Sequence, residues 1–289
     1  MINLLRNFLI NQNTWGLLAG NDLRNLKKIY QPFWIGRADP FLFLNKGTLY
    51  ILFEQINIIS RKGKICIGEI NDFKIKNIKT LLNSKQHLSF PFIFRDKDNR
   101  VFMIPESHKT RSIDIYEFNS ISLTVNKVKT LMTNIECVDT VIYYYDSLYW
   151  LFTTQRSKNN NFNDLYIYFS EDLITADFKP HFNNPVLQNT ETSRSAGPIF
   201  EEDGLIYRVS QNCKIKYGHN VSFTQILKLN KNEFIESEPQ KILINGIKEF
   251  YHTFGKTNNI VVSDFKFKIK NPIILFVLIL KRFFERLLS

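Results

Sequence analysis

The sequence predicts an all-β fold, a five-bladed β-propeller with a C-terminal helical tail. Two observations lead to this fold: paired strand-like segments recur along the chain, and their spacing is nearly constant. The residues that mark successive pairs, Asp39, Pro91, Asp139, Gly197 and His252, lie 52, 48, 58 and 55 positions apart. A period of about fifty residues, built from paired strands, is typical of propellers with four strands per blade.

The first pair shows the pattern. Residues 37–43 and 48–54 hold mainly aromatic and aliphatic side chains, which favour β-strands. Between them, Asn45, Lys46 and Gly47 predict a tight turn, because glycine adopts the positive φ that a hairpin needs. Similar pairs follow at residues 89–106, 137–152, 195–208 and, less clearly, 249–262.

Five pairs indicate five blades, at about residues 36–85, 86–133, 134–186, 187–245 and 246–270. The fifth blade is too short for four strands, so residues 13–35 are expected to supply an outer strand and close the ring. The propeller is therefore assigned to residues 1–270 and the tail to residues 271–289.

Composition narrows the class of protein. Of 289 residues, 44% are hydrophobic, with 26 Phe and 12 Tyr, which suits packed sheets and argues against disorder. The three dispersed cysteines lack metal-ligand spacing, make a disulfide framework unlikely and favour a reducing compartment. The net charge of +11 indicates either attraction to phosphorylated sugars or acidic lipid headgroups, or a generally Lys- and Asn-rich chain. Without a recognition motif or basic helix, nucleic acid is not an expected partner.

The tail contains eight consecutive apolar residues, 273–280, followed by basic and aromatic residues. Eight residues are fewer than a membrane span requires. We expect a helix that either anchors at a membrane surface or packs against the propeller or a partner chain. Residues 1–10 lack the features of a secretory signal, so the expected location is cytoplasmic, with peripheral contact to the inner face of the cytoplasmic membrane if the tail is an anchor.

In a propeller, the first residues of the inner strands converge at one end of the central channel. The residues expected there are Arg37, Asp39, His87, Asp139, Arg194 and His252, joined by Glu54, Glu106, Gln211 and Asp264 from the ends of second strands.

The acidic residues are the catalytic candidates. Asp39 and Asp139 open equivalent strands, and two carboxylates in one funnel can share proton transfer or hold sugar hydroxyls. Each could instead cap its own turn through an Asx hydrogen bond. Glu106, which follows a proline at a strand end, is the third catalytic candidate. Glu54 is either a substrate-binding group or a solvated strand end.

The remaining candidates are expected to bind substrate. Arg194 can grip a phosphate or carboxylate through two parallel hydrogen bonds, or form a structural ion pair with an aspartate. His252 could be a base or a ligand, or could pack against its aromatic neighbours. Arg37, Gln211 and Asp264 are assigned to substrate binding. No His pair has metal spacing and no glycine-rich phosphate loop occurs, so no metal or other cofactor is predicted.

Several motifs occur in a fixed order between about residues 30 and 264: Ala38-Asp39-Pro40-Phe41, Ser89-Phe90-Pro91-Phe92, Ile104-Pro105-Glu106-Ser107, Val138-Asp139, Asn184-Pro185-Val186, Ser193-Arg194-Ser195-Ala196-Gly197-Pro198 and Tyr207-Arg208-Val209-Ser210-Gln211. As an ordered set they resemble the N-terminal propeller domain of the glucosamine inositolphosphorylceramide transferases and its bacterial relatives.

This group in turn resembles the five-bladed glycosidases that act on arabinans and xylans. That resemblance implies Asp39 as general base and Asp139 as the aspartate that tunes and orients. The glycosidases' general acid, a glutamate, usually precedes a Gly-Pro pair, but Ala196 stands there in this chain and cannot donate a proton. Hydrolysis would therefore need Glu106 or Glu191 as a substitute acid.

The resemblance implies a carbohydrate-active propeller in bacterial surface polysaccharide or glycolipid biosynthesis, acting in glycosyl transfer. The expected partners are a sugar or nucleotide-sugar substrate and a glycan or lipid-linked acceptor. Two alternatives remain: a non-catalytic glycan-binding module beside a transferase, and a glycosidase with a displaced acid. In the plant enzymes the transferase chemistry is usually assigned to a separate C-terminal domain, which is not expected within these residues.

Overall fold

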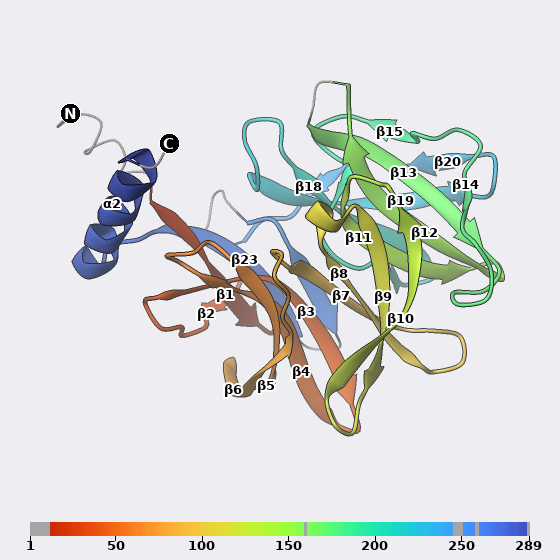
Figure 1. Cartoon of the computed structure of the whole chain (residues 1–289). Coiled ribbons are helices and arrows are strands. Elements are labelled where there is room, and N and C mark those ends of the chain that lie inside the picture. Colours follow the sequence, from red (N-terminus) through yellow and green to blue (C-terminus); the bar gives the residue numbers. More distant parts are fainter. Residues whose placement is uncertain (1–11, 159–160, 245–250, 258–259, 288–289) are drawn as a thin grey trace.

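The computed structural model describes residues 12–158, 161–244, 251–257 and 260–287. Five antiparallel sheets make a five-bladed β-propeller, and a short C-terminal helix lies at one edge, so the predicted fold class is confirmed (Figure 1). The start of the fifth repeat, residues 249–250, lies outside the described residues.

The first two blades have four strands each, and the chain runs outward from the innermost strand. Blade one contains β3 (Ile35–Asn45), β4 (Thr48–Asn57), β5 (Gly63–Asn71) and β6 (Lys74–Leu82). Blade two contains β7 (Ser89–Arg95), β8 (Val101–Glu106), the 3-10 helix η1 (His108–Thr110), β9 (Ser112–Asn119) and β10 (Thr124–Thr133).

The next two blades are extended by short strands. Blade three contains β11 (Cys137–Tyr145), β12 (Leu148–Arg156), β13 (Phe162–Ser170), β14 (Lys179–Pro180) and β15 (Leu187–Gln188). Blade four contains β16 (Arg194–Ser195), β17 (Phe200–Glu202), β18 (Leu205–Asn212), β19 (Asn220–Leu229), β20 (Phe234–Glu236) and β21 (Gln240–Lys241).

Blade five closes the ring with strands from both ends of the chain. Its order is β22 (Phe254–Thr257), β23 (Ile260–Lys268), β1 (Asn13–Gly20) and β2 (Lys27–Lys28). The β1–β23 pairing is continuous from Asn13 opposite Lys268 to Gly20 opposite Val261. The predicted contribution of residues 13–35 to the last blade is therefore confirmed.

The inner strands of blades one to three share one backbone irregularity. Each has a β-bulge in its pairing with the next strand, and within it Asp39, Phe90 and Asp139 adopt φ values of 52°, 43° and 52°. Aspartate tolerates this left-handed conformation better than most residues, and a bulge re-aims the side chain that it carries. The bulges thus direct both aspartates out of the regular alternation of their strands.

Apolar packing joins the blades. The largest buried cluster runs through blades one to four and includes Phe92 and Phe152. Two smaller clusters join blade five to its neighbours, one through Phe254 and one through Val262.

Helix α2 (Pro272–Leu287) confirms the helical tail. The side chain of Asn271 caps it, because its Oδ1 accepts hydrogen bonds from the amides of Ile273 and Ile274 at 3.0 and 3.2 Å. Proline at the first helical position suits this start. Among the described residues, no helix is long and apolar enough to cross a membrane.

Candidate functional site

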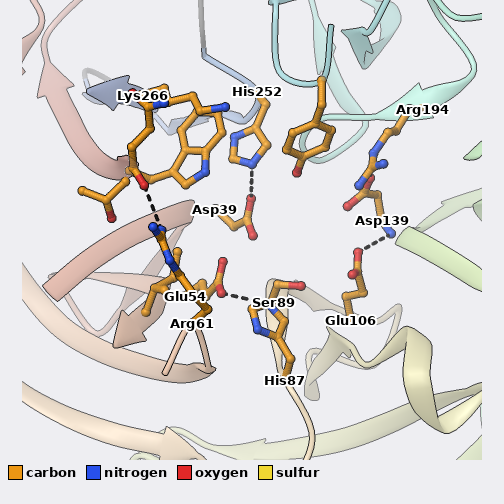
Figure 2. A pocket seen from close by; sticks show the side chains of 15 residues that line it. Asp39, Glu54, Arg61, His87, Ser89, Glu106, Asp139, Arg194, His252 and Lys266 are labelled. Atoms are coloured by element: carbon orange, nitrogen blue, oxygen red, sulfur yellow. Dashed lines mark hydrogen bonds and ion pairs between the residues drawn. The ribbon is translucent and has the colours of Figure 1, made fainter. Parts of the chain in front are cut away.

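A cavity of about 470 Å³ lies where the inner strands begin (Figure 2). It is lined by Asn13, Thr14, Trp15, Asp39, Glu54, Ile56, Arg61, His87, Ser89, Glu106, Asp139, Arg194, Tyr217, His252 and Lys266. Residues from all five blades thus meet in one place, as the convergence of inner strands predicts.

Four carboxylates line the cavity among the residues that the structure describes. Asp39 and Asp139 sit in the bulges of β3 and β11. Glu54 and Glu106 occupy matching positions on second strands, opposite Ala38 and Ser89, the residues that immediately precede the bulges of their blades. The two aspartates therefore occupy one equivalent position of the repeat, and the two glutamates occupy another.

Asp39 is buried and held in place by neutral donors. Its Oδ2 accepts a hydrogen bond from the Phe90 amide at 3.0 Å, and its Oδ1 accepts one from the Thr253 hydroxyl at 2.9 Å. Nε2 of His252 lies 3.5 Å from the same Oδ1. Burial raises the pKa of Asp39, against the opposing effect of His252.

His252 lies between two carboxylates. Its Nδ1 is 2.6 Å from Oδ2 of Asp264, and the Asp264 carboxylate also accepts the backbone amides of His252, Thr253 and Asp39. Although burial opposes protonation, these carboxylates raise the pKa of His252 to about 9, and the imidazolium in turn lowers that of Asp264. The ring stacks on Trp15 at 3.9 Å, and both side chains line the cavity.

Asp139 is paired with Arg194. The Arg194 Nε donates to Asp139 Oδ2 at 2.5 Å, and the guanidinium lies 4.8 Å from the ring centre of Tyr217. Burial would lower the pKa of Arg194, but the neighbouring carboxylate outweighs it and raises that pKa. The Asp139 amide donates to Glu106 Oε2 at 3.2 Å, which links blade three to blade two at the cavity wall.

Glu54 faces His87. His87 Nε2 lies 3.0 Å from Glu54 Oε1, while His87 Nδ1 accepts the Gly63 amide at 3.0 Å, so the proton of the ring sits on Nε2. Burial raises the pKa of Glu54 to about 7, since the histidine offsets only part of the desolvation. Glu54 is thus a buried carboxyl group rather than a solvated strand end.

Three predicted residues lie off the cavity wall. Arg37 stacks over Phe53 at 5.2 Å and donates to the Tyr30 carbonyl, and Gln211 donates to the His252 carbonyl at 3.4 Å. Asp264 is fully buried behind His252. In this structure these side chains support the wall, and their assignment to direct substrate binding is not matched by their positions.

Eight wall residues were not predicted from the sequence, and they include the aromatic residues Trp15 and Tyr217 and the basic residues Arg61 and Lys266. Arg61 is held by hydrogen bonds to the Asn13 carbonyl and to Gln12 Oε1, and Lys266 lies 5.5 Å from the ring centre of Trp15. Figure 2 shows Arg61 and Lys266 on one side of the cavity and Arg194 with Asp139 on the other.

Ala196 stands where the sequence resemblance predicts a general acid. Ala196 is fully buried, and its backbone joins blades four and five by donating to Val209 and accepting from the Phe254 amide. Glu191, one suggested substitute, pairs at the surface with Lys214 and does not line the cavity. Glu106, the other, does line it.

One group of described residues has the composition of a metal site: ligand atoms of Asp39, His252 and Asp264 lie within 4.8 Å of one another. The two ring nitrogens of His252 each face a different carboxylate. With both ring nitrogens directed at carboxylates, the imidazole presents no lone pair to an ion, so we assign no metal to this cluster.

The fold is shared with family 43 glycoside hydrolases. An exo-β-1,3-galactanase from Clostridium thermocellum superimposes with a TM-score of 0.58 and 12% identity over 76% of this chain and 55% of the other. A thermostable family 43 glycoside hydrolase superimposes with a TM-score of 0.58 and 10% identity over 86% of this chain and 90% of the other. At such identities the likeness concerns the fold alone.

Curated relatives are more similar to this chain in sequence than the glycoside hydrolases are. Glucosamine inositolphosphorylceramide transferase 1 from Arabidopsis thaliana is 31% identical over 209 residues, 70% of this chain and 27% of the relative. The protein of the same name from Oryza sativa subsp. japonica is 28% identical over 205 residues, 69% of this chain and 27% of the relative. This chain therefore spans about a quarter of their length. The family model described as glucosamine inositolphosphorylceramide transferase 1, N-terminal, matches residues 33–258, and the chain belongs to that family.

Proposed function

We propose that this protein binds a sugar in the cavity at the centre of the propeller and acts in glycosyl transfer from an activated sugar. The proposed setting is the biosynthesis of a bacterial surface polysaccharide or glycolipid. The observation that carries the proposal is a cavity of about 470 Å³ in which four carboxylates lie beside Arg61, Arg194 and Lys266. Family membership supports the same class of chemistry, because the curated relatives are named as transferases.

The buried alanine favours transfer over hydrolysis. A glycosidase must protonate the leaving oxygen, and Ala196 removes the acid at the usual position. A nucleotide sugar leaves as a stabilised phosphate and needs no carboxylic acid for that step. The departure from the glycosidases is therefore compatible with an activated donor.

Asp39 is the group best placed to activate an acceptor hydroxyl. Its pKa is raised by burial, which makes it a stronger base than an exposed carboxylate, and the Phe90 amide and Thr253 hydroxyl fix its orientation. Asp139 and Glu106 would hold sugar hydroxyls on the opposite side of the cavity.

The phosphate would lie on the side of Arg61 and Lys266. Arg194 also lines the cavity, but its Nε is bound to Asp139, so the phosphate contact first expected of it is shared with or passed to the other two cations. Figure 2 shows Asp39 between these two cations and the Asp139 side of the cavity, and the sugar would lie there.

Two alternatives each have an observation behind them. Glu54, with a pKa of about 7, could serve as the displaced acid of a glycosidase. The extensive bonding of Asp39 and Asp139 within the protein would also suit a rigid glycan-binding module without turnover.

Product analysis separates the three. The purified chain is incubated with a panel of nucleotide sugars, with and without glycan acceptors, and free nucleotide, reducing sugar and extended acceptor are measured. We expect nucleotide release that depends on an acceptor. Reducing sugar released from a glycan alone would indicate the glycosidase, and saturable glycan binding without any product would indicate the module.

A further inference from the structure

We propose that the edge of blade five and helix α2 form a docking face for the surface of an anionic lipid bilayer. The face consists of two exposed sets of apolar side chains. Tyr30, Phe33 and Trp34 on the loop after β2 are 84%, 50% and 50% exposed, and Ile273, Phe276 and Leu280 on α2 are 67%, 59% and 40% exposed. Aromatic rings of this kind are the groups that favour the headgroup region of a bilayer.

The two sets are neighbours. Ile58 donates its amide to the Trp34 carbonyl at 3.4 Å, and its side chain is buried against Ile274 and Leu278 on the inner side of α2. Lys281 fastens the far end of the helix by donating to the Ile59 carbonyl at 2.9 Å. Figure 1 shows the ribbon of α2 beside the end of blade five, and the contacts of Ile58 bring the loop and the helix together there.

An apolar groove of about 520 Å³ lies in the same region. Phe265 and Phe267 stack along it at 5.4 Å, and Phe33 and residues 268–271 are among the other residues that line it. A Cβ at Gly16 would lie 2.7 Å from the Phe265 ring, so the absence of a side chain at Gly16 leaves room for this ring. A groove that is apolar inside and basic at its rim suits the boundary between headgroups and acyl chains.

The two segments of the chain that carry the face are predominantly basic. The sequence has no acidic residue between Asp22 and Asp39 and none between Asp264 and Glu285. Apart from Arg37, which is buried, and Lys266, which lines the cavity, those two segments contain the basic residues Arg24, Lys27, Lys28, Lys268, Lys270, Lys281 and Arg282. This pattern attracts an anionic surface, and it opposes contact with the same face of a second copy.

The helix is suited to lie on a bilayer rather than to cross it. It has 16 residues, and one side is already packed on Ile58, so the outward side presents Ile273 and Phe276. Docking would also place the cavity near the headgroups: on β23, Lys266 lines the cavity while Phe265 and Phe267 line the groove. That last link, access to a lipid-linked acceptor, rests on the proposed function, but the docking itself does not.

Co-sedimentation with vesicles tests the proposal. The full chain is mixed with vesicles of phosphatidylcholine alone or of phosphatidylcholine with phosphatidylglycerol. We expect binding to the anionic vesicles that weakens with salt, and a loss of about tenfold in the partition coefficient for Phe276→Ser combined with Trp34→Ser. Phe182→Ser is the matched control, because Phe182 is 81% exposed and lies on blade three.

Three results would overturn the proposal. One is no binding to anionic vesicles at low salt by folded protein. Another is an equal loss of binding in the Phe182→Ser control. The third is a dimer, detected by light scattering, that Phe276→Ser dissociates while vesicle binding is absent, since the face would then serve a second copy. Because none of these measurements involves a sugar, they are independent of the glycosyl-transfer assay.

Discussion

Arg194 on β16 donates from Nε to Oδ2 of Asp139 on β11, which joins blades three and four at the wall of the cavity. Both side chains are largely buried, at 14% and 7% exposure. The arginine therefore has a structural ion pair as well as a place in the cavity, which is the alternative that its sequence context left open.

Removing this arginine should destabilise the protein. Arg194→Met leaves the Asp139 carboxylate buried without its partner, and we expect the free energy of unfolding to fall by about 3 kcal/mol in urea titrations. Adding Asp139→Asn should restore part of this loss, because the uncompensated charge is gone. Strict additivity of the two changes would contradict the pairing.

Glu54 should make stability depend on pH. Its pKa is raised from 4.5 to about 7, so its contribution is fully present below pH 4.5 and is lost as the pH rises through 7. This corresponds to about 3 kcal/mol of unfolding free energy. In Glu54→Gln this part of the pH dependence should disappear, and the exposed Glu238→Gln should retain it. The same slope in both variants would show that another group is responsible.

His252 should be protonated at neutral pH. NMR titration of its ring resonances should give a pKa of about 9, since Asp264 and Asp39 outweigh the effect of burial. The contribution of the His252 imidazolium to the free energy of unfolding is fully present below pH 6.5 and is lost as the pH rises through 9. Asp264→Asn should lower the pKa of His252. A wild-type value at or below 6.5 would remove the imidazolium from the site.

Lys266 should contribute to the affinity for negatively charged ligands and not to the affinity for neutral ones. If it contacts the donor phosphate, Lys266→Met should weaken binding of a nucleotide sugar by about tenfold in calorimetric titrations, with less salt dependence than the wild type. Lys74→Met, an exposed change on β6, is the control. Equal weakening for a neutral oligosaccharide would point instead to loss of the Trp15 contact.

The fold could be predicted from the sequence because its hairpins are specified by residues that are close together in the chain. Hairpins such as the one at Asn45-Lys46-Gly47 are specified by neighbouring residues, and their repetition carries the blade count. Asp39 and Asp139 were found for the same reason, since both occupy the position of the inner-strand bulge. Ring closure was also anticipated, although its register was not.

The rest of the site depends on contacts between distant segments. Trp15 and Lys266 are adjacent only because β1 pairs with β23, and no local pattern marks either of them as a wall residue. The prediction that Arg37 binds substrate failed for another reason. Arg37 stands two residues before Asp39, so in a regular strand both side chains would point to the same face of the sheet. The bulge between Ala38 and Phe41 breaks that alternation, and Arg37 packs on Phe53.

We propose the carboxylate-lined cavity as the place where sugar chemistry occurs, and the variant Asp39→Asn tests this role. Nucleotide release from a sugar donor in the presence of acceptor is compared for the wild type, Asp39→Asn and Asp96→Asn, a buried aspartate paired with Arg100. We expect a loss of about 10²-fold or more in Asp39→Asn and near wild-type turnover in Asp96→Asn, with both variants folded. Unchanged turnover in folded Asp39→Asn would contradict the account.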